Sequence, residues 1–219
     1  DHLRRHPRAR RAIALDLRGH GDSDPADDGD YSVAGCAGDV AAVADQLGLR
    51  RFVLAGHSFG GSVAIEYAGR HPARVAGLLL VDPSGDQSRI PAEQTASLVA
   101  ALRADPLAET EWHFRQILVN ADPAAAQWVL EDLRLTDENA LIGAMESSLA
   151  FQPLPLLARY AGPRLAVVSD WNSLPVSLHN LVADLPVRLI RGTGHWLQLD
   201  RPEPFNQLLD EFLRTVEGV

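Results

Sequence analysis

One serine of this 219-residue chain stands in a pattern that can make it a nucleophile. Ser58 is the centre of Gly56-His57-Ser58-Phe59-Gly60, which has the spacing G-x-S-x-G, between the apolar run Arg51–Ala55 and the helix-compatible segment Gly61–Arg70. In such a strand–turn–helix the turn strains the serine backbone and aims the N–H of Phe59 at a developing oxyanion. Gly56 and Gly60 are both expected where a side chain would clash. The motif predicts Ser58 as a nucleophile for acyl transfer; the alternative is a glycine-rich turn that contains a serine by chance.

A serine hydroxyl needs a general base, and the chain has eight histidines. His195 stands in the glycine-flanked segment Gly192–Trp196, directly after the apolar run Val187–Ile190. Open α/β sheets bind ligands at the carboxyl ends of their strands, so we expect His195 to be the base. The ring of His57 is expected to point away from the neighbouring serine. The other histidines are interpreted as surface or core residues: His2, His6, His20, His71, His113 and His179.

The elements that must position these residues alternate between strand and helix. Helical patterns cover Asp39–Leu47, Gly61–Arg70 and an apolar stripe from Phe205 to Val216. The alternation predicts an α/β fold, with a mostly parallel sheet flanked by helices. Unbroken apolar runs predict its strands, buried on both faces: Ala12–Leu17, Arg51–Ala55, Val75–Val81, Leu165–Val168 and Val187–Ile190.

The stretch from residue 90 to residue 160 contains no strand-like run. We therefore divide the chain into a core of residues 1–89 and 161–219 and an all-helical lid insert of residues 90–160. Trp112 and Trp128 could line an apolar pocket under the lid, together with Met145 and Phe151, although aromatic residues at helical spacing more often pack within such an insert. Phe59 and Trp196 are the stronger pocket candidates. Four helical segments are expected in the insert: Glu93–Arg103, Leu107–Val119, Pro123–Leu133 and Asp137–Leu149.

Composition and charge exclude several classes of function. The formal net charge is −9 and all 20 basic residues are arginine, without a dense basic patch, which argues against binding to nucleic acid or to an anionic membrane. No apolar run is long enough to span a membrane, and the single cysteine, Cys36, favours a reducing, cytoplasmic location. No histidine or cysteine cluster has metal-ligand spacing, and no glycine spacing matches a nucleotide loop. We expect a small-molecule substrate and no cofactor.

Three segments together resemble the α/β-hydrolase superfamily, most closely its lid-bearing, esterase-like members. They are Gly56–Gly61, the stretch DLRGHGDSD at Asp16–Asp24, and GTGHW…DRPEPF at Gly192–Phe205. The resemblance covers essentially the whole chain. It implies that Ser58 is the nucleophile, His195 the base and Phe59 an oxyanion donor. It also implies that the Asp16–Asp24 loop is chiefly a structural turn beside the site, with Asp22 and Ser23 at its rim.

The resemblance leaves the acid of the triad open. The family usually places this acid three residues after a glycine that ends the penultimate strand, but here the two positions hold Ser169 and Asn172. Asparagine can orient an imidazole but cannot stabilise an imidazolium by charge. Asp82, which ends the run Val75–Val81, is the preferred acid, and Asp170 is the alternative. The non-catalytic interpretations are a turn residue before Pro83 and a solvated loop carboxylate, respectively.

The chain begins at Asp1 in mid-pattern, in a basic stretch that no apolar signal-peptide segment follows. By the resemblance, a His-Gly-type loop with a second oxyanion N–H and two or three edge strands would precede it. We expect a chain without them to be poorly active and prone to aggregation. The expected function is hydrolysis of a small or medium apolar ester or lactone through an acyl-enzyme. The alternatives are a non-catalytic small-molecule-binding protein and a C–C hydrolase or lyase of the same superfamily.

Overall fold

Four parallel strands form the sheet of this protein in the computed structural model, which describes residues 2–5 and 11–217. The strands lie side by side in chain order: β1 (Phe52–His57), β2 (Val75–Val81), β3 (Arg164–Ser169) and β4 (Val187–Ile190). All three strand pairings are parallel, which confirms the predicted α/β class. The register pairs His57 with Val81. Ser58 and Asp82, the next residues of the two strands, therefore leave the sheet side by side.

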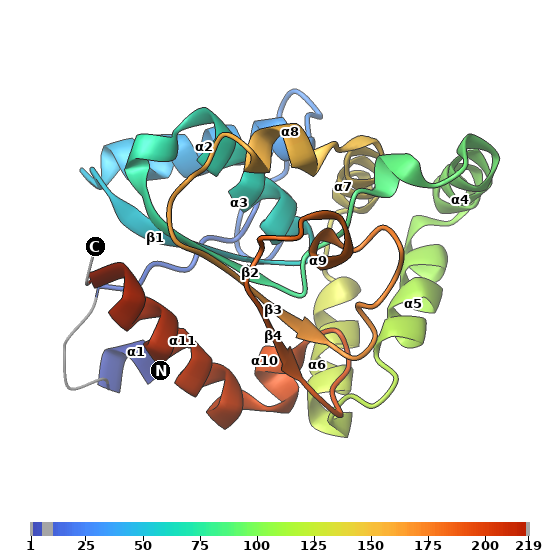
Figure 1. The fold of residues 1–219 in the computed structure, drawn as a ribbon. Coiled ribbons are helices and arrows are strands. Elements are labelled where there is room, and N and C mark those ends of the chain that lie inside the picture. Colours follow the sequence, from blue (N-terminus) through green and yellow to red (C-terminus); the bar gives the residue numbers. More distant parts are fainter. Residues whose placement is uncertain (1, 6–10, 218–219) are drawn as a thin grey trace.

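Helices cover both faces of the sheet (Figure 1). The helices α2 (Val33–Gln46), α3 (Phe59–Arg70) and α8 (Pro153–Leu157) lie on one face, and α11 (Pro202–Glu217) lies on the other. Alternate residues of β2 supply the two halves of the core: Leu78 and Leu80 face the first layer, whereas Leu79 and Val81 pack with α11. Burial on both faces explains why this strand has an unbroken apolar sequence. The remaining short helices are α1 (His2–Arg5), α9 (Leu178–Leu181), α10 (Leu197–Asp200) and two 3₁₀ turns, Pro72–Arg74 and Gln87–Arg89.

The prediction of a strand at Ala12–Leu17 is wrong. These residues form no regular element, and Ile13 and Leu15 are 44% and 38% exposed. An apolar run becomes a strand only when another strand is available for its backbone hydrogen bonds. Within the described part of the chain, β1 pairs with β2 alone, and no strand lies along Ala12–Leu17. The rest of the basic opening, residue 1 and residues 6–10, lies outside the described residues.

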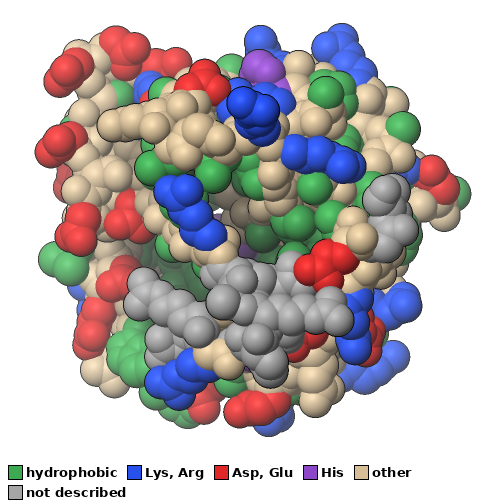
Figure 2. Space-filling model, turned by 90° about the vertical axis from the view of Figure 1, so that its left-hand side faces the viewer, with side chains coloured by type: hydrophobic (Ala, Val, Ile, Leu, Met, Phe, Trp, Pro, Cys, Tyr) green, Lys and Arg blue, Asp and Glu red, His purple; other side chains and the backbone are tan. Residues whose placement is uncertain are grey.

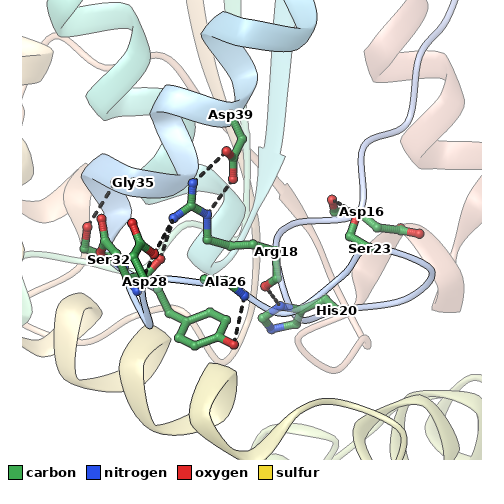
Figure 3. Close-up of polar contacts among 11 residues, drawn as sticks. Asp16, Arg18, His20, Ser23, Ala26, Asp28, Ser32, Gly35 and Asp39 are labelled. Atoms are coloured by element: carbon green, nitrogen blue, oxygen red, sulfur yellow. Dashed lines mark hydrogen bonds and ion pairs between the residues drawn. The ribbon is translucent and has the colours of Figure 1, made fainter.

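The Asp16–Asp24 segment is a turn that its own polar groups hold together, as the resemblance implied (Figure 3). Its Arg18 guanidinium donates two hydrogen bonds to Asp39 of α2, at 2.6 and 2.7 Å, and a third to the Asp30 carbonyl. The Ser23 hydroxyl donates to the Asp16 carbonyl at 2.8 Å. The segment is therefore fixed to the first helix of the core rather than to the sheet.

The helices between β2 and β3 occupy the region where four helical segments were predicted. They are α4 (Ala92–Ala104), α5 (Pro106–Ile117), α6 (Pro123–Leu133) and α7 (Glu138–Ala150). We call these four the inserted helices. The arrows of β3 and β4 point toward them in Figure 1, so they lie at the carboxyl end of the sheet. The following helix, α8, instead packs on α3, and its Leu157 is part of the core.

The opposite side of the molecule, on the left of Figure 1, is hollowed, with hydrophobic side chains in the hollow (Figure 2). A groove at the amino ends of β3 and β4 is lined by Leu157, Arg164, Pro186 and Phe212, among others. Ligands of parallel α/β sheets bind at the other end, so neither feature marks the candidate site. In the described part of the chain no helix is both long and apolar enough to cross a bilayer.

Candidate active site

Ser58 lies at a sharp turn between β1 and α3. Its backbone has φ 50° and ψ −117°, a conformation that a residue with a side chain adopts only under strain of about 1–3 kcal/mol. The Ser58 N–H donates to the Val81 carbonyl at 3.0 Å, which ties the turn to β2. The strained turn predicted for this serine is therefore present, at the carboxyl end of the sheet.

Of the two glycines that flank the turn, only one stands where a side chain would clash with the backbone. A Cβ on Gly56 would lie 2.1 Å from the carbonyl oxygen of Gly60, so no side chain fits there. At Gly60 itself, nothing lies within 4 Å of the position of a Cβ. The expectation that both glycines prevent a clash is therefore wrong for Gly60. Its backbone oxygen is the atom that approaches Gly56, and a side chain at Gly60 itself would meet nothing.

The structure brings Asp82 and His195 together. The Nδ1 atom of His195 lies 2.7 Å from Oδ2 of Asp82. Asp82 follows β2 with φ 40°, is completely buried, and donates its own N–H to the Val167 carbonyl of β3 at 2.7 Å. His195, which is 4% exposed, lies in the loop after β4. Because a carboxylate can only accept, the proton of this hydrogen bond is on Nδ1, and Nε2 is the ring nitrogen that faces no carboxylate.

Ser169 holds the same carboxylate from β3. Its N–H donates to Oδ1 of Asp82 and its hydroxyl to Oδ2, both at 2.8 Å. Burial raises the pKa of the Asp82 carboxyl, but the hydrogen bonds from His195 and Ser169 outweigh burial and hold this pKa below its usual value. Asp82 is therefore an oriented carboxylate anion. Sequence reasoning noticed Ser169 only as a departure from glycine and missed this contact.

Asp170, the alternative acid, lies elsewhere. It is exposed and accepts hydrogen bonds from the Gly192 N–H at 2.9 Å and from Arg191 at 3.3 Å. Asn172 is buried, donates to the Pro83 carbonyl and accepts from the Ser177 hydroxyl. Asp170 thus binds the loop after β4, Asn172 binds Pro83 after β2 and Ser177 within its own loop, and the carboxylate at the His195 ring is that of Asp82.

His57 supports the loop that carries His195. Its Nε2–H donates to the backbone carbonyl of His195 at 2.9 Å, and the two ring centroids are 4.6 Å apart. Burial, together with the neighbouring His195, lowers the pKa of His57 to about 3, so this imidazole is neutral near pH 7. Sequence reasoning missed this contact, because it joins residues 138 positions apart.

Aromatic rings surround the imidazole of His195. Trp196 and Trp171 both lie edge-on to it, with centroids at 5.1 and 5.6 Å, and Phe114 of α5 stacks edge-on to Trp196 at 5.0 Å. Trp196 was predicted here, whereas Trp171 and Phe114 were missed because the apolar runs did not include them. This wall of rings makes the surroundings of the base apolar.

The other expected pocket residues, Phe59, Trp112 and Trp128, are not among these rings. The Phe59 side chain packs against the larger core cluster. Trp112 and Trp128 are 58% and 61% exposed on α5 and α6. Their assignment to a substrate pocket stays a prediction.

The groups that would act on a substrate are not used within the protein. Among the described residues, neither the Ser58 hydroxyl nor the Phe59 N–H has a hydrogen-bond partner. Phe59 is the first residue of α3, where backbone N–H groups have no acceptor within the helix. Catalytic hydrogen bonds are often long before a substrate binds, so a free serine is compatible with a nucleophile.

Comparison with known proteins relates almost the whole chain to one protein family. A model of the alpha/beta hydrolase family matches residues 1–208. The dihydrolipoyllysine-residue acetyltransferase component of the acetoin cleaving system of Pseudomonas putida is 31% identical over 94% of this chain, and the chain spans only 56% of that relative. The 2-hydroxymuconate semialdehyde hydrolase of the same species is 27% identical over 98% of this chain and 81% of its own length. Among solved structures, Est816, described as an N-acyl homoserine lactone degrading enzyme, has a TM-score of 0.63 at 26% identity, covering 90% of this chain and 80% of its own.

Proposed function

The chain belongs to the alpha/beta hydrolase family, and we propose that it is a serine hydrolase that cleaves a small or medium apolar ester or lactone. One observation carries the proposal: a buried carboxylate, Asp82, holds His195 at 2.7 Å at the same end of the sheet as the strained Ser58. Nucleophile, base and acid follow three different strands, β1, β4 and β2, which is how an open parallel sheet assembles a site.

The proposed reaction has two acyl-transfer steps. Nε2 of His195 takes the proton of the Ser58 hydroxyl while Oγ attacks the substrate carbonyl carbon. The Asp82 carboxylate stabilises the imidazolium that forms, and the Phe59 N–H donates to the oxyanion. The imidazolium then protonates the leaving alkoxide; the alcohol of an ester departs, whereas the hydroxyl of an opened lactone stays attached to the acyl group. His195 then takes a proton from a water molecule as its oxygen attacks the acyl-enzyme carbonyl carbon, and the imidazolium gives this proton to Oγ of Ser58 as the acid is released.

The side chains near His195 favour an uncharged acyl group. Trp171, Trp196 and Phe114 supply apolar surface. The positive charges of Arg191 and Arg18 are directed to carboxylates, Asp170 and Asp39, rather than to the base. The likeness to a lactone-degrading enzyme supports including lactones in the substrate class.

The inserted helices supply the rest of the proposed site. We assign them, with the segments that join them, the role of the lid predicted over residues 90–160, because α5 brings Phe114 to Trp196 beside the base. Selection among esters would then depend on α5 and its neighbours rather than on the sheet.

A second function in the same family is C–C bond hydrolysis. The likeness to a 2-hydroxymuconate semialdehyde hydrolase over 98% of this chain favours it. Since the same three residues would serve either reaction, only substrates separate the two.

The test begins with the serine. A fluorophosphonate probe forms a covalent adduct with a serine that a neighbouring base activates, and we expect intact-mass and peptide analysis to find it on Ser58. Ser58→Ala should lose both the adduct and turnover of p-nitrophenyl acetate, butyrate and octanoate, while Ser173→Ala, at an exposed position, should keep them. Turnover of 2-hydroxymuconate semialdehyde without ester cleavage would favour the C–C hydrolase. A wild-type protein that takes no adduct would overturn the proposal in favour of a binding protein.

A further inference from the structure

The inserted helices are joined to the loop that carries His195 through backbone groups of both partners. The N–H of His195 donates to the carbonyl of Ile117, the last residue of α5, at 2.9 Å. One residue earlier in the same loop, a Cβ on Gly194 would lie 3.0 Å from Cβ of Ala121 and 3.2 Å from the Ile117 oxygen. The loop and the segment between α5 and α6 therefore lie so close that a methyl group at Gly194 would require a shift of a few tenths of an ångström.

One carboxylate binds to both sides of this contact. Asp200, the last residue of α10, accepts the N–H of Gly194 on Oδ2 and the N–H of Asp122 on Oδ1, both at 2.8 Å. The first donor belongs to the loop before His195, and the second begins the cap of α6. A carboxylate suits this place because both partners are donors and it offers two acceptor oxygens in one plane.

We propose that Asp200 is a positioning residue that locks the His195 loop to the inserted helices, so that the base and the segment between α5 and α6 move as one unit. The role in turnover rests on the function proposed above, whereas the lock itself does not. Asp200 touches neither His195 nor Ser58 through its side chain; it acts through the backbone at Gly194. Any displacement of the segment from Ile117 to Asp122 would pull on the N–H groups of His195 and Gly194 together.

Other contacts of the inserted helices lie away from the base. The Tyr31 hydroxyl donates to Asp137 at 3.2 Å, the Val33 N–H donates to the Ser147 hydroxyl at 2.9 Å, and the Asp137 N–H donates to the Gly19 carbonyl. They hold α7 to the loop before α2, so loss of Asp200 should free the α5–α6 side without unfolding the whole insert.

The experiment compares Asp200→Ala and Asp200→Asn with Asp105→Ala. Asp105 caps α5 by accepting the N–H of Ala108 at 3.0 Å. Its removal weakens the start of α5, whose last residue is Ile117, but removes no contact of the His195 loop. Amide hydrogen exchange of the intact protein measures directly how firmly the His195 loop is held to the inserted helices. We expect Asp200→Ala to accelerate exchange at least tenfold in peptides that contain Gly194–His195 and Asp122. Asp200→Asn, which keeps one acceptor, should have a smaller effect, and Asp105→Ala should leave the His195 peptide unchanged.

Steady-state kinetics measures whether loss of this contact displaces the proposed base, His195. A displacement of about 1 Å can cost on the order of 10²-fold in rate, so we expect kcat for p-nitrophenyl butyrate to fall 10- to 100-fold in Asp200→Ala, with KM changed less than threefold. Gly194→Ala, whose methyl group would lie 3.0 Å from Cβ of Ala121, should lower kcat by less than Asp200→Ala. Asp105→Ala should keep kcat within threefold.

The two proposals fail separately. A wild-type protein without fluorophosphonate labelling or ester turnover would refute the serine hydrolase, and exchange alone would then decide the lock. If Asp200→Ala folds, as its circular dichroism and melting curve would show, and exchanges like the wild type at His195, Asp200 does not lock the loop. Faster exchange with unchanged kcat in an active enzyme would refute the positioning role.

Discussion

At the scale of single residues, the proposed site takes its carboxylate from the loop after β2 rather than from the loop after β3, where the resemblance places the acid. Asn172 occupies the position expected for the acid and is committed to Pro83 and Ser177. Asp82 reaches His195 instead, and Ser169 orients it with two hydrogen bonds. An oriented anion in a buried place can stabilise an imidazolium far better than a solvated one.

Replacement of Asp82 by asparagine tests this assignment. Asp82→Asn keeps the shape but loses the charge, and we expect kcat for p-nitrophenyl butyrate to fall about 10⁴-fold, as a neutral replacement does in a serine-protease triad. Asp170→Asn is the matched control and should stay within threefold, because Asp170 binds Gly192 and Arg191. Near-normal turnover by Asp82→Asn, or its collapse in Asp170→Asn, would reverse the assignment.

His57 makes a prediction about stability and pH. Its pKa is lowered from 6.5 to about 3, so between these values the unfolded chain binds a proton that the folded protein does not. The free energy of unfolding should therefore fall as the pH drops from 6.5 toward 3, by up to about 1.4 kcal/mol per pH unit from this group. In His57→Gln that contribution is absent. Urea unfolding at pH 4, 5, 6 and 7 should show a shallower decline for the variant, and parallel curves would contradict the prediction.

At the scale of elements, local signals predicted helices well. The helix α6 begins and ends where it was expected, at Pro123 and Leu133, because Asp122 caps it and proline opens it. The helix α2 begins six residues earlier than Asp39, at Val33, where the Ser32 hydroxyl accepts the Gly35 N–H. That cap was visible in the sequence but was not used.

Pairing between distant segments could not be predicted in the same way. The run Ala12–Leu17 has the composition of a strand but lacks a partner in the described part of the chain. The choice between Asp82 and Asp170 likewise depended on which carboxylate reaches the His195 ring, and only the fold decides that. Motif spacing identified the serine and the histidine, whereas their supports, His57, Ser169 and Asp200, come from other elements.

The turn between β1 and α3 yields a prediction with its own control. In Gly56→Ala, the new methyl group meets the Gly60 carbonyl oxygen at 2.1 Å, a clash with backbone that cannot rotate away. We expect the variant to lose about 3 kcal/mol or more of stability. Gly60→Ala places its methyl group in open space and should melt within a few degrees of the wild type. Thermal unfolding followed by circular dichroism decides, and equal melting temperatures would contradict the structure.

At the scale of the whole molecule, the two ends of the sheet differ in character. The carboxyl end gathers the strained serine, the buried carboxylate and the aromatic wall, and the inserted helices lie over it (Figure 1). The amino end is hollowed and apolar in places (Figure 2). Because the inserted helices lie outside the sheet, substitutions in them can alter the proposed site while β2 and β3 keep the core intact.

The exposed apolar run Ala12–Leu17 affects the behaviour of the molecule in solution. Ile13 and Leu15 expose large apolar side chains, and within the described residues β1 leaves one edge unpaired, two features that favour association between copies. We expect the wild type to self-associate at micromolar concentrations, and the double variant Ile13→Arg/Leu15→Arg to do so less. Leu135→Arg is the control, since Leu135 is 84% exposed in the turn after α6. Sedimentation velocity from 1 to 100 µM measures the effect. A wild type that is monomeric throughout, or an equal gain from Leu135→Arg, would show that this run does not drive association.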